Sequence, residues 1–131
     1  MDKAVFQISF RGGEPMSGTV RVDPGSRLEG LAQVMPNENI RAKRVLVRVG
    51  WHTEGRGDKN YANVGELQIS QGNLTAGTPL AQAFALDLPR EPWSFAGHYV
   101  SIVWDVRVIV DIPLGTDLEA IQPIIVAPRR G

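Results

Sequence analysis

The stretch Val100-Ser-Ile-Val-Trp-Asp-Val-Arg-Val-Ile-Val-Asp-Ile112 decides the fold of this chain. Apolar residues occupy every second position from Val100 to Ile112, which is the pattern of a strand with one buried face. The residues between them, from Ser101 to Asp111, are mostly polar and predict a second face that meets water or a partner. Because thirteen residues exceed the usual strand length of about 3 to 10, we expect this strand to bend and other strands to pair along it.

The same alternation returns between Ile40 and His52, where Val45, Val47, Val49 and Trp51 share one face. Shorter alternating segments predict further strands at 4–10, 18–22, 27–35, 64–70, 80–88 and 118–126, with a short helix competing only at 116–122. Glycines and prolines lie between these segments, as turn residues do. The pattern predicts an all-β, antiparallel β-sandwich of about eight strands, of the immunoglobulin-like type.

Composition limits the classes of function. A chain of 131 residues has the length of one domain, so we expect a single sandwich over residues 1–131. Its 14 basic and 14 acidic residues leave no net charge to attract nucleic acid or an anionic membrane. Cysteine is absent, which excludes disulfides and thiolate chemistry. Since no segment reads as a signal peptide or a membrane span, we expect a cytoplasmic protein without a membrane span or a nucleic-acid partner.

Three stretches resemble a known family. Pro24-Gly25 with Leu28 to Gly30, leading into Ile40 to Ala42, is similar to an early strand and its approach in the arrestin-like fold. The segment 45–57 resembles the following long strand and loop of that fold, in the version of bacterial sporulation-control proteins. The segments 84–89 and 92–102 resemble its entry into the long central strand, where a proline is followed by Ser94-Phe95-x-Gly97.

This resemblance implies an arrestin-like β-sandwich. Its motifs are turn and packing signals, so it implies a fold rather than an activity. Arrestins carry two such sandwiches in tandem, whereas this chain has the length for one. No residue of the charged cluster between arrestin lobes is therefore carried over to this sequence.

The polar segment from His52 to Asn60 is the most loop-like part of the chain. We predict a partner-binding site there, formed by His52, Glu54, Arg56, Asp58 and Lys59. An alternative is a metal-dependent enzyme site made by His52, Glu54 and Asp58, with His98 as a remote fourth ligand. A zinc site needs three or four ligands and the chain has two histidines in all, so we expect neither a metal nor another cofactor.

The aromatic residues are predicted to be structural. Trp51 and Trp104 stand at apolar alternating positions of the two long strands and are expected in the core. Trp93 and Phe95 are expected to fold back as a cap over the core. The alternative is that Trp93, Phe95 and Tyr99 form an aromatic platform for a small molecule or a carbohydrate.

No catalytic motif surrounds the serines at 17, 94 and 101 or either histidine. Outward charges on the long strands, Arg44 and Arg48 on one and Asp105, Arg107 and Asp111 on the other, are expected to pair with each other. We therefore predict a non-enzymatic adaptor or scaffold domain. It would bind another protein through the polar loop, through an exposed sheet edge by strand addition, or by self-association.

Overall fold

Alternating apolar and polar residues give the chain ten strands and no helix in residues 2–57 and 59–129, the parts that the computed structural model describes. None of these residues belongs to a helix that could cross a membrane. The strands are β1 (Ala4–Arg11), β2 (Glu14–Met16), β3 (Thr19–Val22), β4 (Arg27–Pro36), β5 (Arg44–Gly55), β6 (Tyr61–Gln71), β7 (Leu80–Asp87), β8 (Phe95–Ala96), β9 (Val100–Asp111) and β10 (Leu118–Val126).

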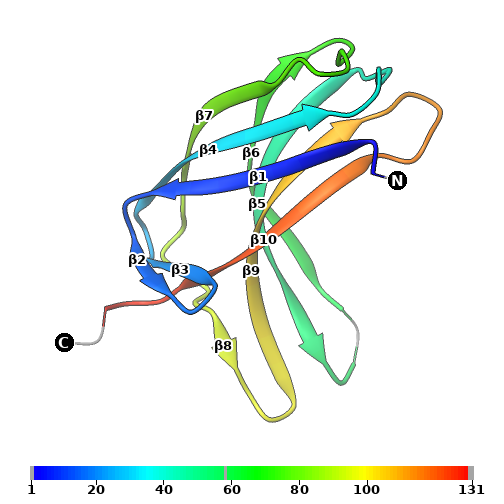
Figure 1. Cartoon of the computed structure of the whole chain (residues 1–131). Helices are drawn as coiled ribbons and strands as arrows, with labels where there is room; N and C mark the ends of the chain where they lie inside the picture. The colour runs from blue at the N-terminus through cyan, green and yellow to red at the C-terminus, as the bar shows by residue number, and fades with distance from the viewer. Residues whose placement is uncertain (1, 58, 130–131) are drawn as a thin grey trace.

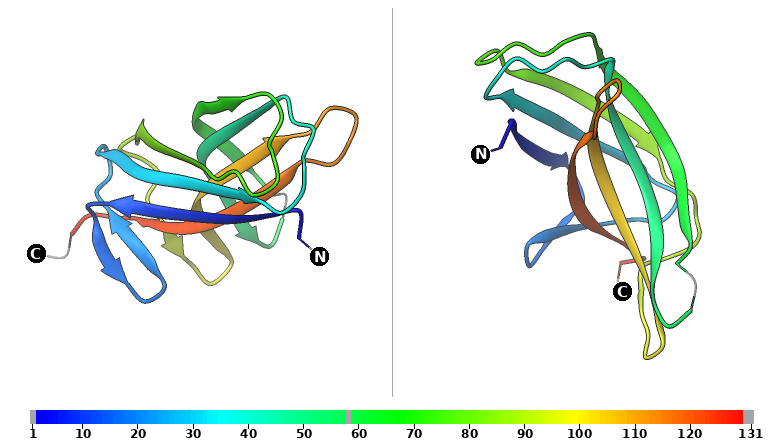
Figure 2. Two further views of the ribbon diagram at one scale, coloured as in Figure 1. Left: turned by 45° about the horizontal axis from the view of Figure 1, so that its top comes forward. Right: turned by 90° about the vertical axis from the view of Figure 1, so that its right-hand side faces the viewer.

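The strands form two layers, which Figures 1 and 2 show from three directions. The smaller sheet has three strands in the order β1-β4-β7, and the larger has seven, in the order β2-β3-β10-β9-β5-β6 with β8 also paired to β9. All pairings are antiparallel except that of β10 with β3. The fold is therefore the predicted all-β sandwich.

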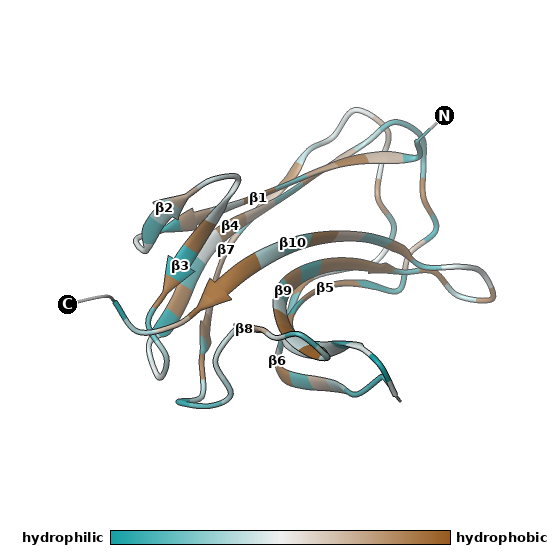
Figure 3. Ribbon diagram, turned by 90° about the horizontal axis from the view of Figure 1, so that it is seen from below, coloured by the Kyte–Doolittle hydropathy of each residue, from teal (hydrophilic) through white to brown (hydrophobic). Residues whose placement is uncertain are grey.

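The core lies between the layers and is built on β5 and β9. These strands pair over their whole length, with Val47 opposite Val108 and Trp51 opposite Trp104. The inward residues of both are fully buried: Val45, Val47, Val49, Trp104, Val106, Val108 and Val110. Each such side chain contributes about 1.5–3 kcal/mol of transfer free energy. Figure 3 shows the two layers from below, with hydrophobic and hydrophilic residues alternating along the strands.

Two short strands and one strand end differ from the sequence prediction of about eight strands. β2 has three residues and β8 has two, too few for a readable alternation. The strand predicted to end at His52 continues to Gly55, because Thr53 to Gly55 pair with residues 100–102 of β9. The competing helix at 116–122 is absent, since this segment forms β10 and pairs with β9.

The aromatic residues divide between the core and the surface. Trp104 is fully buried, and Trp51 is partly buried and packs against the core. The prediction that Trp93 and Phe95 belong to the core is wrong, because their side chains are 51% and 54% exposed. The intervening Ser94 explains this: its amide donates to the Val126 carbonyl at 2.8 Å and its Oγ accepts from the Val126 amide at 2.9 Å.

Candidate functional site

Two segments far apart in the sequence meet at one end of the molecule, the lower end in Figure 1 and in the right view of Figure 2. One is the connection between β5 and β6, and the other is the segment that forms β8 and enters β9. Gly55 lies opposite Val100 in the β5–β9 pairing, and the Arg56 amide donates to the Tyr99 carbonyl at 3.1 Å. We call this end the tip and define it as residues 54–57, 59 and 93–100.

Gly55 makes the close approach of the two segments possible. Its φ of 136° lies in the region that favours glycine. A Cβ atom at this position would overlap the Tyr99 carbonyl oxygen. The tip therefore depends on a residue without a side chain at the point where its two halves touch.

Large apolar side chains are exposed at the tip. The exposed fractions are 51% for Trp93, 54% for Phe95, 64% for Tyr99 and 41% for Val100. The guanidinium of Arg56 lies 5.8 Å from the centre of the Tyr99 ring, and the His98 ring stands edge-on to it at 4.7 Å. This combination of Trp, Tyr and Arg is typical of the residues that dominate binding energy at protein interfaces.

A cavity of about 350 Å³ opens beside the rings of Trp93 and Phe95. It is lined by Glu91, Pro92, Trp93, Ser94, Phe95 and Ile102. The indole N–H of Trp93 donates to the Arg90 carbonyl at 2.9 Å, and the Ser94 hydroxyl is bonded to Val126. The indole N–H and one acceptor site of the hydroxyl thus serve the fold, and the mostly apolar lining suits an apolar group.

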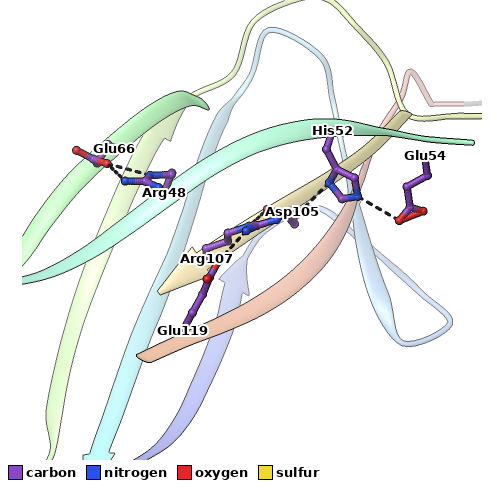
Figure 4. Close-up of polar contacts among 7 residues, drawn as sticks. All are labelled: Arg48, His52, Glu54, Glu66, Asp105, Arg107 and Glu119. Atoms are coloured by element: carbon purple, nitrogen blue, oxygen red, sulfur yellow. Dashed lines mark hydrogen bonds and ion pairs between the residues drawn. The ribbon is translucent and has the colours of Figure 1, made fainter. Parts of the chain in front are cut away.

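Behind the tip, the outer face of the large sheet carries a polar cluster that Figure 4 shows. Asp105 is buried and accepts two hydrogen bonds from Arg107, at 2.9 Å from Nε and at 3.1 Å from Nη2. Arg107 also donates to Glu119 at 2.8 Å and lies 5.1 Å from the centre of the Tyr61 ring. The hydrogen bonds to Asp105 raise the pKa of Arg107 above its ordinary value. The guanidinium therefore remains charged in this cluster.

His52 joins this cluster to the end of β5. Its Nε2 lies 3.1 Å from Glu54 Oε1. Its Nδ1 is buried and lies 3.5 Å from Asp105 Oδ2 without forming a hydrogen bond. The imidazole thus lies between a buried carboxylate and an exposed one, and it positions the side chain of Glu54 at the base of the tip.

The structure describes four of the five predicted partner-binding residues. His52 and Glu54 lie on strand β5, whereas the prediction ended the strand at His52 and placed Glu54 in the loop. Arg56 and Lys59 are exposed beyond the strand. Asp58 lies outside the described residues. Within the described residues no three His, Asp or Glu side chains are arranged to hold a metal ion.

The predicted pairing of the outward charges holds in part. Arg44 pairs with Asp111 at 3.2 Å across β5 and β9, as expected. Arg48 instead pairs with Glu66 on β6 at 2.7 Å, and Arg107 pairs on its own strand and with Glu119 on β10. Sequence reasoning missed Glu66 and Glu119, since only the strand order brings them beside the arginines.

These ion pairs surround a second cavity of about 350 Å³ on the outer face. Its lining is Arg44, Leu46, Arg48, Tyr61, Arg107, Ile109, Asp111, Asp117 and Glu119. Three arginines and three carboxylates balance there. The arginines are engaged by carboxylates, so this face has no excess charge of either sign to select an ionic ligand.

Comparison with known proteins supports the fold. No family model matches the sequence, and no curated protein matches it. The crystal structure of Spo0M, a sporulation control protein from Bacillus subtilis, is similar, with a TM-score of 0.73 at 14% sequence identity. The match covers 98% of this chain and 51% of that chain, so this chain spans about half the length of Spo0M. The predicted arrestin-like fold, similar to that of bacterial sporulation-control proteins, is thereby confirmed.

Proposed function

We propose that this arrestin-like sandwich is a non-enzymatic cytoplasmic adaptor that binds another protein through its tip. The observation that carries the proposal is the exposure of Trp93, Phe95 and Tyr99, at 51%, 54% and 64%, together with the guanidinium of Arg56, which lies 5.8 Å from the centre of the Tyr99 ring. Large apolar side chains that are exposed close together mark interaction sites in water-soluble proteins, and Trp93 and Phe95 line one cavity. Aromatic residues and arginine are also the residues that interfaces enrich.

The backbone of the tip supports the same function. β5 and β9 extend into it as paired strands, and the Arg56–Tyr99 and Ser94–Val126 hydrogen bonds hold its segments. A surface that is already ordered loses little conformational entropy on binding, which favours affinity. The resemblance in fold to a sporulation control protein is consistent with a regulatory adaptor, although fold alone does not determine function.

A carbohydrate or another small molecule is the second candidate ligand, because the exposed rings of Trp93 and Phe95 line a cavity of about 350 Å³. Small-molecule sites combine apolar walls with several convergent polar groups. Here the Trp93 N–H and the Ser94 hydroxyl are bonded within the chain. Glu91 is left as the one charged side chain of the lining. This composition favours an apolar side chain of a protein partner over a sugar.

The test is affinity purification of the tagged chain from its native host, followed by mass spectrometry and binding measurements with the recovered protein. We expect the double variant Trp93→Ala/Tyr99→Ala to bind that protein at least about 30-fold more weakly, since an interface hot spot contributes about 2 kcal/mol or more. The matched control is Leu114→Asn, which removes a fully exposed apolar side chain from the β9–β10 turn, where φ is positive. Asparagine tolerates that backbone conformation, so this variant should bind normally.

Unchanged binding by the tip variant, or equal loss in the control, would contradict a binding site at the tip. Titration of the wild-type chain with a glycan panel, followed by tryptophan fluorescence, addresses the second candidate. Saturable quenching that disappears in Trp93→Phe would favour a carbohydrate ligand over a protein.

A further inference from the structure

The two sheets end in the edge strands β1 and β7 of the small sheet and β2 and β6 of the large one. Edge strands present unpaired N–H and C=O groups, and proteins protect them by short length, proline, bulges or charge. β2 has three residues and contains Pro15. β6 is irregular against β5 at two places, carries Glu66 and contacts β7, which lies at the edge of the other sheet.

From Ala4 to Phe10, β1 has none of these protections. It pairs with β4 in continuous register over eight residues, from Ala4 opposite Pro36 to Arg11 opposite Glu29. No proline and no charged residue occurs between Ala4 and Phe10. Its outward-facing Val5 is 56% exposed. β1 therefore has the features of an edge that accepts another strand.

The apolar face of β1 is incompletely covered. Phe6, Ile8 and Phe10 point towards the core but are only partly buried. A groove of about 410 Å³ separates Ile8 and Phe10 from the β2–β3 hairpin, with Pro15, Met16, Thr19 and Val20 on its far side. Side chains from an added strand would fill this groove and complete the burial of the three residues.

We propose that a second copy of this chain binds along β1, so that two three-stranded sheets join into one of six strands. A symmetric pair of identical strands is related by a two-fold axis, and residues that face each other must point to the same side of the sheet. The axis must therefore lie between the two copies of one residue, which face each other. An axis at Gln7 would place Lys3 opposite Arg11, and like charges directly opposite are unfavourable.

An axis at Ile8 avoids that conflict. Ile8 then faces Ile8 of the second copy, and Phe6 faces Phe10, so the partly buried apolar residues cover one another. On the outer side Gln7 faces Ser9. Within Ala4–Arg11 this register pairs aromatic with aromatic and opposes no like charges, and it makes a second copy the chemically complementary occupant of the edge.

The tip takes no part in this interface, so the inference does not rest on the proposed function. The test is the molar mass of the purified chain by sedimentation between about 1 μM and about 1 mM, the range in which weak interfaces form. We expect a reversible monomer–dimer equilibrium for the wild type. Gln7→Lys/Ser9→Lys places lysines opposite each other twice, and it should weaken dimerisation at least about tenfold.

The control is Gln7→Lys/Ser9→Glu, which places opposite charges at the same two contacts and should dimerise at least as well as the wild type. Both positions are exposed in the monomer, and circular dichroism will show whether each variant folds. A wild type that is monomeric throughout the range, or equal dimerisation by the two edge variants, would overturn the proposal. Loss of the dimer in Trp93→Ala/Tyr99→Ala but not in the edge variants would also overturn it, because self-association would then occur at the tip.

Discussion

Asp105 is a buried carboxylate on a sheet face whose other charged residues are partly exposed. It lies opposite Gly50 in the β5–β9 pairing. A Cβ atom on Gly50 would overlap the Ala62 carbonyl oxygen, so β6 approaches closely at this point. Burial of a carboxylate is unfavourable unless hydrogen bonds compensate it, and here Arg107 provides two.

The first prediction concerns this pair. Asp105→Asn should lower the free energy of unfolding by about 1–3 kcal/mol, because one of the two buried oxygens that accept from Arg107 becomes an amide donor and loses its hydrogen bond. Urea denaturation measures the change. The control Glu66→Gln removes the carboxylate of a more exposed pair with Arg48 and should cost less than about 1 kcal/mol. Equal effects of the two substitutions would show that Asp105 has no special role.

The charge that Arg107 brings to this contact should not change with pH in the physiological range. The pKa of Arg107 is raised in the folded state by its hydrogen bonds to Asp105. A raised folded-state pKa contributes stability that is present below the unfolded pKa and is lost only as pH rises through the folded one. For an arginine that loss falls at strongly alkaline pH, so no change at neutral pH arises from Arg107.

At the scale of elements, the tip depends on the contact between the β5 end and the entry into β9. Gly55→Ala should separate them, since a Cβ atom would overlap the Tyr99 carbonyl oxygen. We expect the Arg56 amide, which donates to that oxygen, to lose its protection from hydrogen exchange measured by NMR. The control Gly57→Ala has a positive φ of 98° but nothing within 4 Å of its Cβ position, so it shares the backbone strain without the overlap.

Protection of the Arg56 amide that survives in Gly55→Ala would argue against this account of the tip. A loss of the same size in Gly57→Ala would attribute the effect to backbone strain alone. If the tip binds a partner as proposed, Gly55→Ala should also weaken that binding more than Gly57→Ala does.

The long strands were predictable because their burial follows directly from alternation. Val45 to Val49 and Trp104 to Val110 are buried at the predicted positions. The loop boundary was not, since Thr53 and Glu54 are consecutive polar residues on opposite faces of the strand end, and polarity alone cannot distinguish such a strand end from a loop. The meeting of Gly55 with Val100 depends on a register between segments 45 residues apart.

The burial of a side chain could be predicted only where it depends on the alternation of the strand that carries the residue. Asp105 alternates with apolar residues and was expected to face outward, which it does, but its cover comes from His52 and Arg107. Trp93 and Phe95 were assigned to the core on hydrophobicity. Their exposure follows from the bonds between Ser94 and Val126, 32 residues away. The candidate site could therefore be identified only from the structure, whereas the sandwich could be predicted from the sequence.

At the scale of the whole molecule, stability should be unevenly distributed. β5 and β9 are paired on both sides and carry the buried core. The β2–β3 hairpin joins the large sheet through a parallel pairing of only two residues with β10. Arg21 reinforces that junction, with Nη1 donating to the Ala127 carbonyl at 2.6 Å and to Asp23 at 2.8 Å.

Arg21→Met should therefore release the hairpin while it leaves the core intact. Native-state hydrogen exchange is the measurement, because it reports local opening separately from global unfolding. We expect amides of β3 to exchange at least about tenfold faster in the variant, a loss of about 1.4 kcal/mol of local stability. Amides of β5 and β9 should still exchange only through global unfolding, which costs about 5–15 kcal/mol in domains of this kind. An equal loss of protection in all three strands would instead mean that the hairpin and the core unfold as one cooperative unit, with Arg21 contributing to the stability of both.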